Sequence, residues 1–211
     1  MDKNIIKKFA VQARRDLIEQ IMNEANSLGI DEKGALSELP SSTNDIKFYR
    51  DDRDIGLTGR KIRWRAELVK LLNNRSKKSD WQTAFKDTIE EVAYTWFNRI
   101  IAIRFMEVND YLPSRVRVLS SEEGRAEPDI IFYAQDEDLI EELGKYSPEE
   151  EKLVNKAKTT GHAYDMDQMY QMLFNKQVDA LNKILPGLFE KTSDYMKLSF
   201  TPKYNSGVIK N

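Results

Sequence analysis

The sequence has 211 residues, of which 40% are hydrophobic and 32% are charged, with a net charge of −2. This length and composition predict one large globular domain or two small ones, and they exclude a disordered chain. Cysteine is absent, which excludes disulfides and thiolate metal sites, and no apolar run reaches the roughly 18 residues needed to cross a bilayer. We therefore expect a soluble, cytoplasmic protein with no membrane partner.

The near-neutral total conceals two stretches of opposite charge. Basic residues dominate positions 60–78, where Glu67 stands alone among the acids, and acidic residues dominate positions 122–151. The overall charge therefore argues neither for nor against a nucleic-acid partner, and only the local basic segment argues for one.

The first half of the chain predicts two helices and a long connection. Apolar residues at spacings of three and four predict a helix over residues 3–28, which Gly29 can end in a left-handed conformation. The polar stretch 31–58 predicts a connection with at most one short helix, around residues 33–38. Residues 59–74 predict a second amphipathic helix.

The strongest helical pattern spans residues 81–107. Two neighbouring apolar stripes leave only a narrow polar face, so we expect this helix at the centre of the core. The stripes are Phe85, Ile89, Val92, Trp96, Ile100 and Ile103, and then Ala93, Phe97, Ile101 and Phe105. Arg99 and Arg104 fall within this helix and predict structural ion pairs if they are buried. Glu90, Glu107 and the acidic stretch are the available partners.

The patterns after the central helix are shorter. Residues 114–120 alternate between apolar and basic side chains, which fits a short extended piece, and residues 128–143 predict a helix. Ser147, followed by proline and three glutamates, predicts another helix start. Residues 165–185 predict the last amphipathic helix.

Together these elements predict an all-α fold, an irregular helical bundle around one long central helix, with at most a short extended segment near residues 114–120. We expect a single helical domain over residues 1–200, for which sub-lobes at 1–113 and 114–200 are an alternative. The polar tail at 201–211 fits a link to a further domain.

Catalytic signatures are missing from the sequence. It has neither a phosphate-binding Gly-x-x-x-x-Gly-Lys loop nor a dinucleotide fingerprint. Its single histidine, His162, precedes a predicted helix and suits a loop or capping role better than that of a general base. We therefore predict no catalytic residue, metal ligand or cofactor site in this chain.

Two runs of residues resemble a known family. Residues 90–116 read EEVAYTWFNRIIAIRFMEVNDYLPSRV, and the first helix carries Phe9-Ala10 and then ARRDLIE at residues 13–19. These runs resemble the amino-terminal region of the adenine-specific DNA methyltransferases of bacteriophage-exclusion (BREX) defence systems. The resemblance runs through most of the chain, although residues 31–58 and the acidic stretch are not diagnostic.

The resemblance implies an activity that belongs to a longer protein. The full enzymes are several times longer and methylate the exocyclic amine of adenine in host DNA, with S-adenosylmethionine as the methyl donor. Their cofactor and base-gripping motifs lie downstream of the region that this chain resembles, and no Asn-Pro-Pro-Tyr loop occurs here. We therefore expect a fragment without catalysis, in which S-adenosylmethionine is a cofactor of the parent enzyme alone.

The first functional hypothesis is that the basic segment helps to hold DNA against a downstream methyltransferase domain. Phosphate contacts from lysine and arginine would add salt-sensitive affinity without reading sequence. The candidates are Lys61, Arg63, Arg65, Arg75, Lys77 and Lys78, with Arg115 and Arg117 as a second patch. The alternative is a solvated helix face whose long side chains cover Trp64 and Leu68.

The second hypothesis is a protein-interaction module that contacts other BREX proteins. The acidic residues between 136 and 151 and a stripe of Met166, Met169 and Met172 are its features, because methionine suits adaptable surfaces. The alternative for the methionine stripe is a place in the core.

Overall fold

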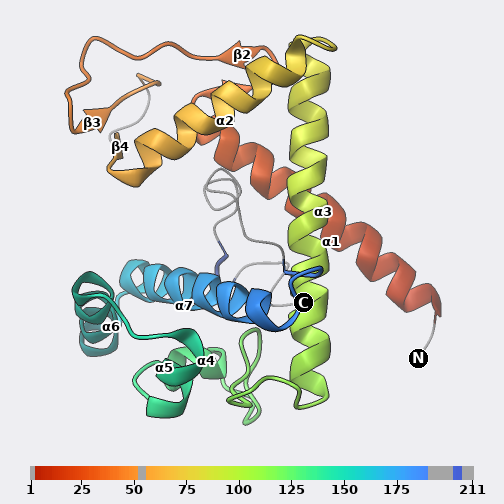
Figure 1. The fold of residues 1–211 in the computed structure, drawn as a ribbon, viewed down its shortest axis with the longest axis vertical. Coiled ribbons are helices and arrows are strands. Elements are labelled where there is room, and N and C mark those ends of the chain that lie inside the picture. Colours follow the sequence, from red (N-terminus) through yellow and green to blue (C-terminus); the bar gives the residue numbers. More distant parts are fainter. Residues whose placement is uncertain (1–2, 52–55, 190–201, 206–211) are drawn as a thin grey trace. The chain divides into compact units, whose positions relative to one another are not determined.

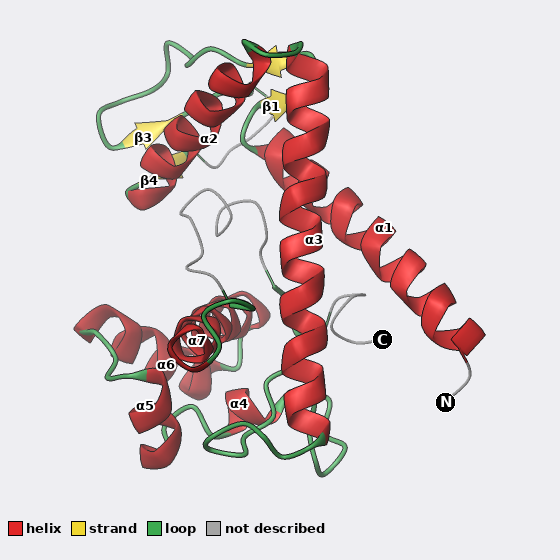
Figure 2. Ribbon diagram, turned by 45° about the vertical axis from the view of Figure 1, so that its right-hand side comes forward, coloured by secondary structure: helices red, strands yellow, loops and turns green. Residues whose placement is uncertain are grey.

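The computed structural model describes residues 3–51, 56–189 and 202–205. Helices dominate this part of the chain (Figures 1 and 2), and its strands are two-residue pieces in antiparallel pairs. The predicted all-α class is confirmed. The described residues form two compact units, unit 1 up to Trp96 and unit 2 from Phe97 onward. The boundary between them falls inside the long central helix, and the predicted tail at 201–211 lies largely outside the described residues.

Unit 1 begins with helix α1 (Lys3–Ser27), close to the predicted span. Leu17 and Ile21 are fully buried on its inner side. Gly29 ends the helix with a φ of 70°, as predicted. A Cβ at this position would lie 2.9 Å from the Cβ of Tyr49. Both the left-handed backbone and the close approach therefore require glycine here.

The connection after α1 forms two small antiparallel pairs, so the expected short helix near residues 33–38 is wrong. The pairs are β1 (Ile30–Asp31) with β2 (Gly34–Ala35), and β3 (Ile46–Lys47) with β4 (Leu57–Thr58). The carboxylate of Asp31 accepts hydrogen bonds from the backbone N–H groups of Lys33 (2.8 Å) and Gly34 (3.1 Å). This local turn competes with helix formation, which explains the difference.

Helices α2 (Arg60–Ser76) and α3 (Trp81–Val108) match their predicted spans to within two residues. The carboxylate of Asp80 caps α3 by accepting a hydrogen bond from the Thr83 N–H at 2.8 Å. The indole of Trp81 donates to the carbonyl of Asp31 at 2.8 Å, which fixes the start of α3 to the first strand pair.

The two apolar stripes of α3 have different environments. The first stripe is buried throughout, and Trp96 has no exposed surface. The second stripe begins buried at Ala93 but is exposed at Ile101 and Phe105. The expectation that α3 is buried around most of its circumference is therefore wrong for its second half, which packs only one side into unit 2.

In the described part of unit 2, three helices pack against a fourth and longer one. They are α4 (Asp129–Phe132), α5 (Glu137–Leu143), α6 (Pro148–Thr160) and α7 (Ala163–Ile184). α7 packs against each of the other three (Figures 1 and 2). The single helix predicted over 128–143 is interrupted at residues 133–136, where Asp136 becomes the N-cap of α5. Residues 114–120 form a loop without a strand.

The predicted helix start at Ser147 is confirmed. The Ser147 hydroxyl accepts from the Glu150 N–H at 3.3 Å, and the Glu150 carboxylate accepts from the Ser147 N–H at 2.8 Å. This reciprocal capping box satisfies two backbone donors of the first turn of α6.

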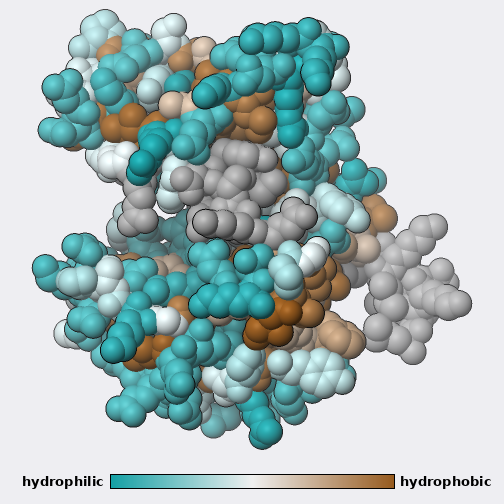
Figure 3. Space-filling model, in the orientation of Figure 1, coloured by the Kyte–Doolittle hydropathy of each residue, from teal (hydrophilic) through white to brown (hydrophobic). Residues whose placement is uncertain are grey.

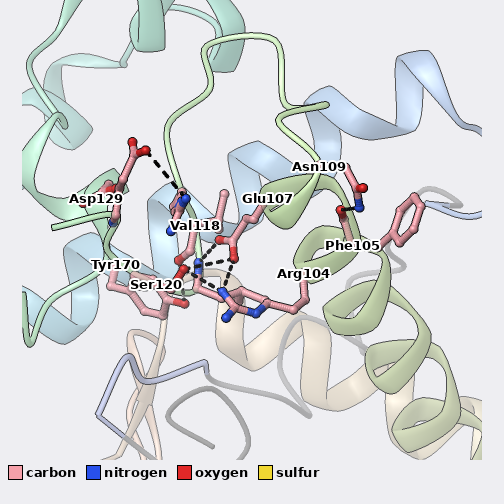
Figure 4. A network of polar contacts seen from close by, with 11 residues as sticks. Arg104, Phe105, Glu107, Asn109, Val118, Ser120, Asp129 and Tyr170 are labelled. Atoms are coloured by element: carbon pink, nitrogen blue, oxygen red, sulfur yellow. Dashed lines mark hydrogen bonds and ion pairs between the residues drawn. The ribbon is translucent and has the colours of Figure 1, made fainter. Parts of the chain in front are cut away.

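Buried Glu107 ties the loop after α3 back to this helix (Figure 4). Its carboxylate accepts hydrogen bonds from the Leu119 N–H and from the Ser120 hydroxyl. Arg104 forms the expected ion pair with the same carboxylate at 3.0 Å, but its own side chain is 51% exposed, so it is not the buried cation that the prediction assumed. Arg99, by contrast, is buried. The hydrogen bonds and the ion pair of Glu107 explain why its charged carboxylate is retained inside unit 2.

Hydrophilic side chains predominate on the face drawn in Figure 3, and hydrophobic ones gather in limited patches. Across the described part of the chain, no helix combines the length and the hydropathy that a bilayer span needs.

Candidate nucleic-acid interface

Helix α2 has a buried side and an exposed basic side. Leu68 and Leu72 are buried, whereas Arg63 and Lys70 are exposed. A helix turns by about 100° per residue, so every seventh position returns to nearly the same side. Lys77 follows α2 with helical backbone angles, and it therefore continues the line of Arg63 and Lys70. We call Arg63, Lys70 and Lys77 the basic face.

The three cations of the basic face are available for external contacts. Neighbouring members are about 10 Å apart along the helix axis. Within the described part of the chain none of the three forms an ion pair, although Lys77 donates to the amide oxygen of Asn74 at 3.3 Å. Glu67 is the single acidic residue among positions 60–78 of the sequence. The net charge of this side is therefore positive, which attracts a polyanion.

Three further predicted residues lie elsewhere on α2 and the turn after it. Lys61 and Lys78 are exposed near the two ends of the helix. Arg75 is half-buried and forms an ion pair with Glu91 at 2.7 Å, and it donates to the Thr88 hydroxyl at 3.0 Å. Arg75 therefore joins α2 to α3 and has less freedom to reach an external phosphate.

Arg65 is a structural residue. It is 6% exposed, and it donates to the backbone carbonyls of Leu28 (2.7 Å) and Leu36 (2.8 Å). Burial lowers the pKa of its guanidinium, and its interactions with Tyr49 and Glu38 oppose that shift. These contacts hold the guanidinium inside unit 1, so Arg65 is no longer a candidate for contact with DNA phosphates.

Comparison with known proteins identifies relatives of the chain, although no family model matches it. The whole chain is 53% identical to the adenine-specific methyltransferase PglX of Lacticaseibacillus casei (strain Zhang), of which it spans 17%. Over 202 residues it is 30% identical to the adenine-specific methyltransferase BrxX of Escherichia coli O9:H4 (strain HS), of which it spans 15%. The chain is related to a segment of these adenine-specific methyltransferases.

This relationship confirms the resemblance inferred from residues 90–116. The chain spans about one-sixth of the length of its PglX and BrxX relatives. Groups of three or more potential metal ligands do not occur among the described residues. The basic face of α2 is a candidate binding surface.

The second predicted patch lies in unit 2. Arg115 is exposed and has a φ of 59°, unusual for a residue with a side chain. Arg117 is half-buried and lies 3.8 Å from the carboxylate of Glu122. These two arginines belong to a different unit from the basic face, so they remain a separate candidate for phosphate contact.

Several features of the protein-interaction hypothesis have structural roles. Met169 is fully buried, and Met166 and Met172 are half-buried, so the methionine stripe belongs mainly to the core of unit 2. Asp136 caps α5 by accepting hydrogen bonds from two backbone N–H groups. His162 is exposed at the N-cap of α7, where its side chain makes no capping hydrogen bond.

Lys70 was not among the residues predicted from the sequence to contact phosphate, because the density of charge along the chain does not single it out. Lys70 is separated from the other basic residues in sequence, but the seven-residue spacing places it between Arg63 and Lys77. That spacing is the signal that identifies it.

Proposed function

We propose that this chain is an amino-terminal helical accessory domain of an adenine-specific DNA methyltransferase of the BREX type. In this proposal the domain helps to hold duplex DNA for a downstream catalytic domain, which binds S-adenosylmethionine and transfers the methyl group to adenine. Such an enzyme acts on host DNA in the cytoplasm and marks it as self against phage.

The exposed basic face of α2 is the observation on which the DNA role rests. Its three cations lie on one side of a helix that is anchored to unit 1 by buried Leu68, Leu72 and Arg65. A rigid row of cations suits the regular negative charge of a duplex backbone, and it offers no arrangement for reading base edges. The expected contribution is positioning without sequence preference.

The test is duplex binding by the full-length enzyme at two salt concentrations. The triple variant R63Q/K70Q/K77Q is expected to bind a fluorescent duplex about tenfold or more weakly at low salt, and to differ less from the wild type at high salt. The matched control is K86Q/K152Q/K183Q, which removes the same charge from exposed positions on α3, α6 and α7. Equal loss in both variants, or none in either, would reject the basic face as the contact.

The runner-up is the protein-interaction module, whose partners would be other BREX proteins. Exposed Glu137, Glu141, Glu149 and Glu151 on α5 and α6 favour it, because exposed carboxylates are complementary to a basic partner. Retention of other BREX proteins by the full-length enzyme, lost when these glutamates become glutamines, would support this alternative.

A further inference from the structure

The second half of α3 carries exposed apolar side chains on one side. Ile101, Phe105 and Val108 are spaced by four and three positions, which places them on one side of the helix. They are 39%, 59% and 64% exposed, and Tyr111 beyond the helix is 61% exposed. The rings of Phe105 and Tyr111 meet edge to face with centroids 5.9 Å apart. We call these four residues the apolar stripe.

The apolar stripe lies on a different side of α3 from the residues that pack into the core of unit 2. The opposite side of the same helical turns is already buried, at Ile103, Met106 and Glu107. A helix with a second apolar side has a second surface to bury, and contiguous exposed apolar groups of this kind mark interaction sites. The spacing of the stripe is also that of helix-mediated recognition.

We propose that the apolar stripe is the docking face for the methyltransferase polypeptide that follows residue 211. This inference rests on the proposed function, because it requires a longer chain. The chain spans about one-sixth of its PglX and BrxX relatives, so most of the polypeptide in those enzymes lies outside the matched segment. Domains of one chain that pack together bury about 600–1,500 Å² between them, and an exposed apolar stripe can supply part of that area.

The end of the described chain lies in the same unit as the stripe. The ring of Tyr204 packs edge to face against Tyr170, with centroids 5.9 Å apart. The Tyr170 hydroxyl donates to the carbonyl of Val118 at 3.2 Å. The next residue, Leu119, donates its N–H to Glu107, which lies in α3 between Phe105 and Val108. These contacts tie residues 202–205 to the turns of α3 that carry the stripe, on the opposite side of the helix, so the two are separated by one helix diameter, roughly 10 Å.

This placement favours a tethered occupant over a free one. A segment tethered to residues 202–205 is held at high local concentration within reach of the stripe, which makes its docking an intramolecular event. Arg104 flanks the stripe but is paired with Glu107, so no acidic partner is needed there. The docking surface is therefore expected to present aliphatic and aromatic side chains.

The test is photo-cross-linking in the full-length enzyme. Phe105 is replaced by benzoylphenylalanine, which keeps an aromatic ring at the stripe, and the cross-linked peptides are mapped by mass spectrometry. The matched control places the same group at Tyr164, which is 74% exposed at the start of α7. We expect position 105 to cross-link within one polypeptide to peptides beyond residue 211, at least tenfold more often than position 164.

Four outcomes would overturn the docking proposal. They are a cross-link to a second copy, a cross-link to another protein, a cross-link confined to residues 1–211, and equal yields from the two positions. Duplex binding and adenine methylation by the same preparations separate the two proposals. If the enzyme methylates adenine and the basic-face variant still weakens duplex binding, an overturning cross-link result rejects the docking face alone.

Discussion

The guanidinium of Arg65 lies 3.3 Å from the centroid of the Tyr49 ring. The same group donates to the carbonyls of Leu28 at the end of α1 and of Leu36 after β2. One side chain of α2 thus organises the connection that follows α1, and it does so with a charge that is shielded from solvent. A basic residue two positions away, Arg63, is exposed instead. The two arginines should therefore respond differently to substitution.

We expect Arg65→Met to lower the free energy of unfolding by about 2–5 kcal/mol, because it leaves a buried carbonyl at Leu28 and a part-buried carbonyl at Leu36 without their charged donor. Arg63→Met should change it by no more than about 0.5 kcal/mol, as is usual at exposed positions. Chemical denaturation followed by circular dichroism measures both. Similar small changes in the two variants would mean that Arg65 is solvated and that its contacts to unit 1 are wrong.

Trp96 and Tyr94 provide a second matched pair, on α3. Trp96 has no exposed surface, whereas Tyr94 is largely exposed. Trp96→Ala should cost about 3–5 kcal/mol, because it removes a large buried ring and leaves a cavity. Tyr94→Ala should cost less than about 1 kcal/mol, since little of its ring is packed. A negligible shift in the melting temperature of the Trp96 variant would place the core elsewhere.

The helices were predictable because their apolar periodicity is local, but their environments were not. Ile101 and Phe105 fit the period of a buried stripe as well as Trp96 does, and only the positions of the other helices decide which side is covered. The pairs β1–β2 and β3–β4 were missed for a related reason. A strand of two residues is too short to show alternation, and its position depends on contacts distant in sequence, such as that of Arg65 with Leu28.

The candidate site was likewise predictable from the sequence only in part. Charge density along the chain correctly indicated that α2 is basic, and helical spacing was sufficient to place Lys70 beside Arg63 and Lys77. Neither signal could show that the Arg65 side chain reaches the interior. The two carbonyl groups that accept its hydrogen bonds belong to a connection without regular periodicity. Burial of a long cationic side chain depends on acceptors that only the fold brings together.

Asp129 predicts a pH dependence of stability in unit 2. Burial by itself raises the pKa of its carboxyl, but hydrogen bonds from the Glu122 N–H (3.0 Å) and the Arg125 guanidinium (2.9 Å) outweigh burial and hold the pKa below its usual value. A carboxyl with a lowered folded pKa stabilises the protein above its unfolded pKa of about 3.9. That contribution is lost as the pH falls through the folded pKa.

We therefore expect Asp129→Asn to be less stable than the wild type at pH 7, with a gap that shrinks as the pH falls below about 4. Urea unfolding at a series of pH values between 7 and 3 measures this gap. Asp45→Asn, at an exposed position, is the control and should leave the pH profile close to that of the wild type. A gap that stays constant down to pH 3 would show that the carboxylate of Asp129 contributes no such linkage.

The basic face predicts how the salt dependence of DNA binding falls as charges are removed. Each phosphate contact contributes about 0.9 to the slope of log K against log salt concentration for duplex DNA. Variants of the full-length enzyme that lack one, two or three of Arg63, Lys70 and Lys77 should therefore lose about one unit of slope per residue. Arg65→Lys serves as an internal comparison, because its side chain is buried and should leave the slope unchanged in protein that remains folded.

The same series distinguishes backbone contact from base reading. Phosphate contacts carry no sequence information, so each variant should weaken binding to a duplex with the methylation site and to one without it by the same factor. Fluorescence anisotropy with both duplexes, each titrated at several salt concentrations, gives the two ratios directly. A loss restricted to the duplex with the methylation site would mean that these side chains read bases, because contacts to the backbone alone cannot produce a difference between two duplexes of equal length and charge.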